Sequence, residues 1–254
     1  MRDRIENINH LSDAKNDDAA PRHHLATRVW HWLNVLALAV MLMSGLMIFN
    51  AHPRLYWGEY GANLDHAWLD LTRADGVTFP GWVTIPSYYS LADARLWHFA
   101  FAWLLVVVSV AYAAWSLVSG HLRRKLLPHR SELVPARFWR DVLDHLRLDF
   151  SHSGGGYNTL QKLAYCGVLY GLVPLAILTG MAMSPALNAA FPLLLDLFGG
   201  RQSARSLHFI AAAGLVAFVF IHLAMLVLAR GDQELRAMVL GGPRRRGATG
   251  AGDE

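Results

Sequence analysis

The stretch RSLHFIAAAGLVAFVFIHLAMLVLAR, residues 205–230, decides the fold of this chain. The 24 residues between its terminal arginines carry no charged side chain. At about 1.5 Å per residue they are enough to cross a hydrocarbon layer of roughly 30 Å. His208 and His222 stand 14 positions apart, so they lie within about 40° of one helical face and about 21 Å apart along the axis. One membrane helix therefore presents two histidines on the same face at two depths.

Three further windows lack Asp, Glu, Lys and Arg, namely Val29–Pro53, Leu96–Leu122 and Leu163–Leu195. The chain is 54% hydrophobic and only 17% charged, which is too apolar for an ordinary soluble domain. We therefore predict an all-α integral membrane protein built as a bundle of four transmembrane helices. The predicted spans cover about residues 28–49, 95–119, 159–183 and 204–229.

The connections between the spans differ in basic charge, and this difference predicts the orientation. The connection from Ser119 to Asn158 carries seven Lys and Arg residues, and the chain after Ala229 carries five. The other two connections carry only three and two. Because an excess of Lys and Arg marks the cytoplasmic side, we expect both termini in the cytoplasm and the loop 50–94 in the periplasm. The net charge of +4 then reflects orientation, and nucleic-acid binding is not expected.

The same reading divides the chain into a cytoplasmic tail (1–27), a membrane domain (28–232) and a disordered cytoplasmic tail (233–254). Within the cytoplasmic loop 120–158, the stretch PARFWRDVLDHLRLDFS from Pro135 has an apolar and a charged helical face, which indicates a helix lying in the membrane interface. Cys166 is the only cysteine, so neither a disulfide framework nor a protein-ligated iron–sulfur cluster is expected within this chain.

The four membrane histidines fall into two pairs according to their predicted depth in the membrane. His31 begins the first span on the cytoplasmic side, whereas His98 begins the second span on the outer side. His98 is thus level with His208, and His31 with His222. Two imidazoles at one height can bind one iron from both sides, so we predict two b-type haems stacked across the bilayer, each with two histidine ligands and no open position for a substrate. Hydrogen bonding between helices is the alternative role of each histidine.

Small and cationic residues accompany these ligands. Gly45 and Gly180 lie at the outer depth in the first and third spans, where a haem between helices needs room beside the backbone. Arg28, Arg95 and Arg205 each precede a predicted ligand by one helical turn. A haem propionate at the membrane edge would pair with such an arginine, although reaching toward lipid headgroups explains the same positions.

The chain resembles the bacterial di-haem cytochrome b family in the stretches RVWHWLN, LMSGLMIFNAHPRLYWGEYG, LWHFAFAW, YNTLQKLAY, LTGMAMSP and FGGRQSARSLHF. Members are membrane subunits of nickel–iron hydrogenases, formate dehydrogenases (the gamma subunit) and thiosulfate reductases. The likeness covers about residues 22–239 and is strongest to the thiosulfate-reductase type, which is associated with an extracytoplasmic molybdopterin oxidoreductase. The family's haem ligands correspond to His31, His98, His208 and His222.

The resemblance implies a protein of the bacterial inner membrane that exchanges electrons with quinone near the cytoplasmic haem. It points to Asn158 and Gln161 as hydrogen-bond partners of a quinone carbonyl, with Leu160 where the family segment has glycine. We therefore expect a respiratory electron-transfer subunit, itself non-catalytic, that links a periplasmic molybdopterin-dependent oxidoreductase to the quinone pool. The partner would dock on the aromatic-rich loop 50–94.

Two other functions fit the sequence. One is a self-sufficient quinone reductase that oxidises superoxide, which needs a positively charged entrance near the outer haem. Five arginines could line it: Arg54, Arg73, Arg95, Arg201 and Arg205. The other is a haem-free membrane scaffold or sensor, in which the histidines have no cofactor to bind.

Overall fold

The computed structural model describes residues 25–62, 64–122, 127–128, 134–135, 139–140, 142–143, 159–228 and 232–241. The chain divides into two compact units. One is formed by residues 33–223, and the other by the chain up to residue 32 together with the chain from residue 224. Nearly all of the residues that concern function lie in the first of these units.

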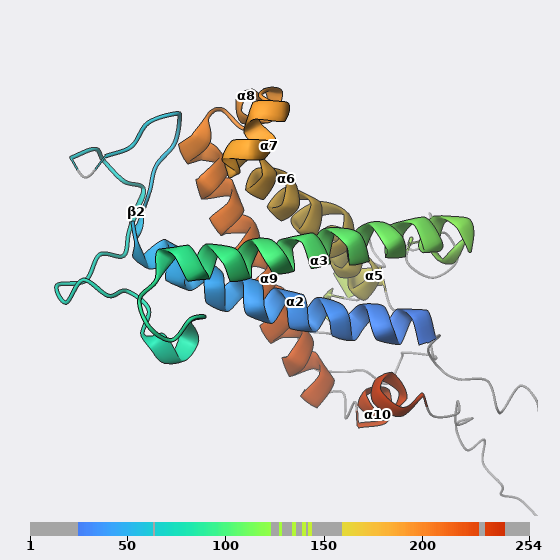
Figure 1. Cartoon of the computed structure of the whole chain (residues 1–254). Coiled ribbons are helices and arrows are strands. Elements are labelled where there is room, and N and C mark those ends of the chain that lie inside the picture. Colours follow the sequence, from blue (N-terminus) through green and yellow to red (C-terminus); the bar gives the residue numbers. More distant parts are fainter. Residues whose placement is uncertain are drawn as a thin grey trace, which may run out of the picture. The chain divides into compact units, whose positions relative to one another are not determined.

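Four helical segments of the described chain are long and apolar enough to cross a membrane, as predicted. Each overlaps one of the windows without charged residues. The predicted fold class, a helical membrane bundle, is therefore confirmed. The segments are α2 (Leu25–Asn50), α3 (Leu91–Val118), the joined run of α5 (Thr159–Gly167), η3 (Val168–Leu172) and α6 (Val173–Met183), and α9 (Arg201–Leu228) (Figure 1).

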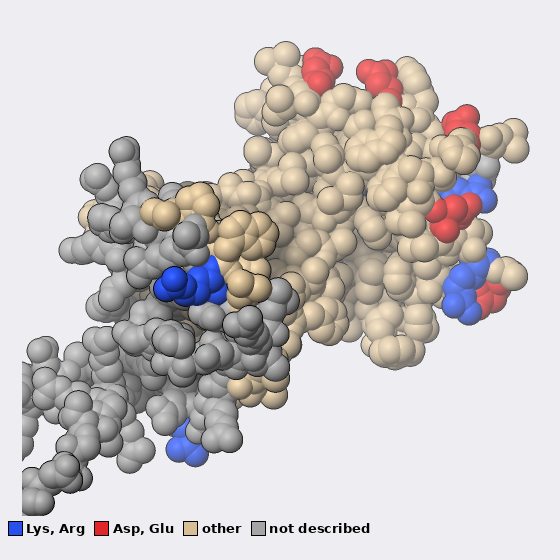
Figure 2. Space-filling model, turned by 180° about the vertical axis from the view of Figure 1, so that it is seen from behind, with Lys and Arg blue, Asp and Glu red and all other residues tan. Residues whose placement is uncertain are grey.

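The outer faces of these helices are apolar and exposed. Large side chains such as Val107 and Val110 on α3 and Phe220 on α9 are mostly accessible. Figure 2 shows one face on which tan side chains cover the helices and the charged side chains lie at the margins. An exposed apolar surface of this extent is unfavourable in water and is the expected surface toward lipid.

Local capping sets the start and the end of α3. The Ser90 hydroxyl accepts a hydrogen bond from the backbone N–H of Asp93 at 3.3 Å, and Asp93 adds a carboxylate to the first turn. Both features stabilise a helix N-terminus. At the other end Gly120 takes a positive φ of 68°, a conformation that ends many helices and favours glycine.

The third span is interrupted, and its interruption packs against α9. The π-helical turn η3 precedes Pro174 at the start of α6. Proline lacks the N–H that a continuous helix would need, and a π turn changes the hydrogen-bonding register there. Beyond it, Val173 and Ala176 form a core with Ala211 and Leu215 of α9. The part of the third span that follows the interruption is therefore held in place by packing against α9.

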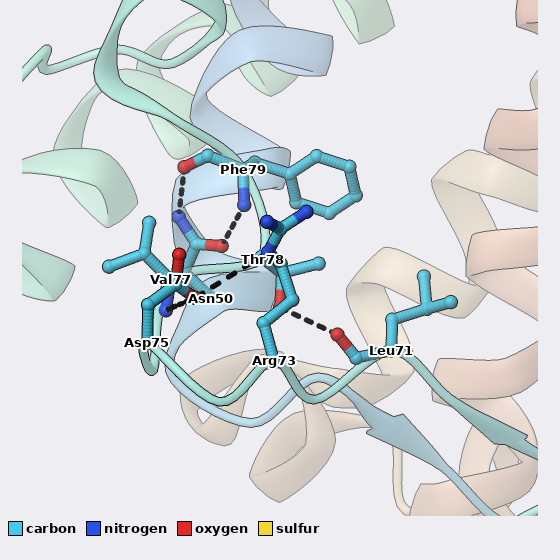
Figure 3. A network of polar contacts seen from close by, with 7 residues as sticks. All are labelled: Asn50, Leu71, Arg73, Asp75, Val77, Thr78 and Phe79. Carbon is cyan, nitrogen blue, oxygen red and sulfur yellow. Dashed lines mark hydrogen bonds and ion pairs between the residues drawn. The ribbon is translucent and has the colours of Figure 1, made fainter.

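Residues 51–90 connect α2 to α3, and the described part of this loop holds short elements of secondary structure. Strands β1 (Arg54–Leu55) and β2 (Leu69–Asp70) pair antiparallel, and a short 3-10 helix η1 (Gly81–Val83) follows. Asn50 fixes the loop to the end of α2, because its side chain donates to the Phe79 carbonyl at 2.9 Å and accepts from the Phe79 N–H at 2.8 Å. Figure 3 shows this exchange.

The same loop caps the start of α9. The Gly58 carbonyl accepts hydrogen bonds from the backbone N–H groups of Gln202 (3.0 Å) and Ser203 (3.1 Å). The Ser206 hydroxyl donates to the Tyr56 carbonyl at 2.5 Å and accepts from Trp68 Nε1 at 2.9 Å. The loop therefore satisfies the N–H groups that a helix N-terminus leaves without partners.

The connection from α6 to α9 holds two short helices, α7 (Pro185–Ala190) and α8 (Leu193–Leu197), which the sequence analysis did not predict. Most of the predicted interfacial helix, from Pro135 onward, lies outside the described residues.

The structure differs from the predicted C-terminal tail, because α10 (Asp232–Leu240) is helical where we expected disorder from residue 233. The Arg28 Nε donates to the Met238 carbonyl of α10 at 3.0 Å. A cation at the C-terminal carbonyls stabilises a helix end. The expected disorder was extended from the Gly/Arg-rich stretch after residue 240 to residues 233–240, which form a helix with a single arginine, Arg236.

Candidate functional site

His98 projects from the second turn of α3 toward α2. Its Nδ1 lies 3.1 Å from the Met41 carbonyl and 3.1 Å from the Ser44 hydroxyl. The Ser44 hydroxyl donates its own proton to the Val40 carbonyl at 2.7 Å, so it can only accept from the imidazole. His98 Nδ1 therefore carries the hydrogen and donates it to both oxygens.

His208 has the same environment on another pair of helices. Its Nδ1 lies 2.9 Å from the Ala176 carbonyl and 3.1 Å from the Thr179 hydroxyl, both on α6. The Thr179 hydroxyl donates to the Leu175 carbonyl at 2.6 Å. His208 Nδ1 is therefore also the donor, and Nε2 of each histidine is left as the nitrogen with a lone pair.

Each histidine also packs on a glycine. A Cβ at Gly45 would stand 3.5 Å from His98 Cε1, and a Cβ at Gly180 would stand 3.3 Å from His208 Cε1. We call Met41, Ser44 and Gly45 the α2 cradle, and Ala176, Thr179 and Gly180 the α6 cradle. The glycines, predicted to leave room for a haem, thus lie against the imidazole rings.

The two histidines lie side by side at one height. Their ring centres are 6.2 Å apart and their planes are inclined by 65°. A metal–imidazole bond of about 2 Å, with about 1.1 Å from nitrogen to ring centre, places the centres of two imidazoles on opposite sides of one metal roughly 6 Å apart. The spacing and the hydrogen-bonded Nδ1 atoms therefore fit two ligands of a single haem iron.

Residues 22–241 match the prokaryotic cytochrome b561 family. The chain belongs to this family. Its members are membrane proteins that bind haem b, so the chain is a membrane b-type cytochrome. Family membership also argues against the haem-free scaffold.

Several relatives have names that describe redox subunits. The "Putative protein-methionine-sulfoxide reductase subunit YedZ1" of Azospira oryzae is 33% identical over 215 residues, 84% of this cytochrome and 93% of the relative. The "Probable Ni/Fe-hydrogenase B-type cytochrome subunit" of Cupriavidus necator is 22% identical and the "Putative cytochrome YdhU" of Escherichia coli is 26% identical. These two alignments cover 84% and 85% of this cytochrome, and 80% and 71% of the relatives. No solved structure matches the chain.

The second predicted ligand pair of the cytochrome, His31 and His222, is divided between the two units. In its own unit His31 packs edge-on against Trp32, with ring centres 5.2 Å apart. His222 stacks on Phe218 at 5.8 Å, and Phe218 in turn contacts Tyr165. Their pairing stays a prediction.

The three arginines predicted near haem propionates have different surroundings. Arg28 donates to carbonyls at the end of α10, and Arg95 is exposed beside the Phe99 ring, 5.6 Å from its centre. Arg205 is half-buried at the start of α9, where it donates to the His52 carbonyl. Among the described residues no carboxylate pairs with Arg205.

The surroundings of Arg205 include two groups that sequence reasoning missed. Tyr56 lies close enough to act on Arg205 electrostatically, and its buried hydroxyl has no hydrogen-bond partner among the described residues. The His52 ring stacks on Tyr56, with ring centres 5.9 Å apart. Burial, followed by the charges of Arg205 and Arg54, lowers the pKa of His52. This part of the molecule therefore favours a bound anion.

Of the two predicted quinone contacts, Gln161 lies half-buried in the first turn of α5, whereas Asn158 lies outside the described residues. Sequence reasoning also missed Ser44 and Thr179. The signal that could have found them is the hydroxyl residue directly before each of the two selected glycines, in MSG and LTG.

Proposed function

We propose that this cytochrome holds two b-type haems and carries electrons between quinone and a redox enzyme that docks on loop 51–90. The observation that carries the proposal is the pair His98 and His208, with matched Nδ1 partners and ring centres 6.2 Å apart. A haem held by two histidines takes up and returns single electrons and has no open position for a substrate.

The residues around the pair have roles in binding and orientation. The two cradles hold both imidazoles with Nε2 available, which fixes ring position and tautomer before the cofactor enters. The half-buried Arg205 would hold a propionate carboxylate, with Tyr56 as a hydrogen-bond donor beside it. Arg95 would serve as a second cation at the same membrane edge.

The second haem would be held by His31 and His222 near the opposite membrane surface, where Asn158 and Gln161 would bind the quinone. We assign that surface to the cytoplasm because the adjoining segments carry most of the Lys and Arg residues. Both termini then lie in the cytoplasm of a bacterium, with the protein in its inner membrane. Arg28 would stay at the end of α10 or turn to a propionate of this haem.

The partner would be a periplasmic oxidoreductase, of the molybdopterin-dependent class. Relatives named as subunits of a methionine-sulfoxide reductase and of hydrogenases support a redox partner. Loop 51–90 supplies exposed aromatic side chains for docking, among them Tyr60, Trp82, Tyr88 and Tyr89. Such side chains are common at protein interfaces.

Direct oxidation of superoxide is less well supported. Attraction of a small anion requires uncompensated positive charge around the entrance. Arg54 pairs with Asp70 at 2.9 Å and Arg73 with Asp75 at 3.5 Å. Two of the five arginines that could line the entrance are therefore largely compensated, and a third, Arg205, is assigned above to a haem propionate.

Haem content tests the proposal. The protein is purified in mild detergent, its reduced-minus-oxidised spectrum is recorded, and haem per chain is measured as the pyridine haemochrome. We expect two b-type haems, and one after His98→Ala or after His31→Ala. A single haem in the unaltered protein, or two haems that survive both substitutions, would refute the proposal.

A further inference from the structure

We infer that Ser44 and Thr179 are positioning residues that lower the reduction potential of the haem held by His98 and His208. The inference rests on the proposed function, because it requires that these histidines bind one iron. It concerns the hydroxyl groups of the two cradles, which neither the family's description nor the relatives' names assign to any role.

The first support is that the two cradles are built alike. In each one the histidine Nδ1 meets a hydroxyl and the backbone carbonyl three residues before it, and a glycine follows the hydroxyl residue. The Nδ1 distances to the carbonyl are 3.1 Å for Met41 and 2.9 Å for Ala176, and both distances to the hydroxyl are 3.1 Å. The same four-group arrangement on two unrelated helices indicates a shared requirement.

The second support is the direction of the hydrogen bonds. Ser44 and Thr179 are completely buried, and each gives its proton to the carbonyl four residues earlier on its own helix. That bond would satisfy a serine or threonine in any membrane helix. It does not explain why the hydroxyl oxygen also faces an imidazole nitrogen at both sites.

The physical effect follows from this direction. An imidazole that donates Nδ1–H to an acceptor gains electron density and becomes a better donor at Nε2. A better donor favours the oxidised iron and lowers the potential, and the buried surroundings strengthen the effect. Each imidazole here has two acceptors, so removal of one hydroxyl leaves the carbonyl and should raise the potential without loss of the haem.

The test uses redox titration and the EPR spectrum of the oxidised full-length protein. Ser44→Ala and Thr179→Ala should each shift the ratio of oxidised to reduced haem three- to tenfold, or about 28 to 59 mV upward at about 59 mV per tenfold change. The double variant should shift about twice as far. Ser44→Thr and Thr179→Ser should restore the original value and the original EPR spectrum.

Ser116→Ala is the matched control. Ser116 is also a completely buried helical serine, but its hydroxyl has no hydrogen-bond partner among the described residues. It should leave the potential unchanged.

Two haems per chain with an unshifted potential in both alanine variants would overturn the inference and leave the proposed function intact. Loss of the haem in either alanine variant would also overturn it, since the hydroxyl would then serve retention and not tuning. Fewer than two haems in the unaltered protein would instead refute the proposed function.

Discussion

The α2 cradle and the α6 cradle present the same three groups to a histidine from different backbones. The α2 cradle lies on an unbroken helix, whereas the α6 cradle follows the π turn η3 and Pro174. The α6 cradle is also tighter, with a carbonyl distance of 2.9 Å against 3.1 Å and a glycine approach of 3.3 Å against 3.5 Å. The comparison teaches that the local hydroxyl–glycine pair, and not helix regularity, creates the histidine environment.

Loop 51–90 is attached both to α2, beside the α2 cradle, and to α9, beside His208, but through different kinds of contact. Next to the α2 cradle, the backbone N–H of Ile85 donates to the Met43 carbonyl at 3.2 Å. Two residues before His208, the loop is held by the Ser206 side chain, through Tyr56 and Trp68. A side-chain substitution can therefore weaken the attachment on the α9 side alone.

The largest effect should come from removing either imidazole, with no further loss when both are removed. If the two cradles serve one iron, His98→Ala, His208→Ala and the double variant should all contain one haem per chain in place of two. The reason is that a bis-histidine haem is lost with either ligand. Pyridine haemochrome measurements check this. A double variant with less haem than each single variant would show that the cradles serve different irons.

Ser206→Ala should have the next largest effect. It leaves the Tyr56 carbonyl and the Trp68 indole N–H without their buried partner, at a cost of about 1–3 kcal/mol of unfolding free energy. Denaturant titration in detergent measures this cost. Ser116→Ala, which removes an equally buried hydroxyl without a described partner, should cost nothing. Equal losses in the two variants would contradict the role of Ser206.

Gly180→Ala should reveal the tighter cradle. Its added Cβ would stand 3.3 Å from His208 Cε1, so the ring must shift by a few tenths of an ångström. We expect a loss of about 1 kcal/mol from overpacking. Gly45→Ala, at an ordinary contact of 3.5 Å, should change little. The temperature at which each variant releases haem, monitored by its Soret absorbance, ranks the two variants. The reverse order would show that the α2 cradle is the tighter one in solution.

The smallest effect should be a pH dependence from His52, beside Arg205. Burial and the charges of Arg205 and Arg54 lower the pKa of His52 in the folded protein. As the pH falls through about 6.5, His52 therefore takes up a proton in the unfolded chain before it does so in the folded protein. The free energy of unfolding decreases over this range until the pH passes the lower pKa of the folded state. His52→Gln should flatten the change in thermal midpoint between pH 7.5 and 5.5, values chosen about one unit either side of the unfolded pKa. His66→Gln, at an exposed loop histidine, should retain it.

Part of the candidate site could be predicted from the sequence. His98 and His208 each lie near the start of a predicted span, which placed both at one depth in the sequence analysis. The structure brings their rings together. The hydroxyls of Ser44 and Thr179 could not be predicted, because a serine or threonine in a membrane helix is ordinarily satisfied by its own backbone. The helix α10 was missed because the Gly/Arg-rich stretch that follows it was taken to begin before it.

The sequence by itself determined that four apolar helices span a membrane and that histidines lie at two depths. Both properties are local, since the length of an apolar run and the 3.6-residue period depend on the chain alone. Only the tertiary structure decided which carbonyl and hydroxyl meet each imidazole, how the π turn orients the α6 cradle, and how loop 51–90 caps α9. These contacts depend on the rotation and close approach of helices, which packing between distant segments determines.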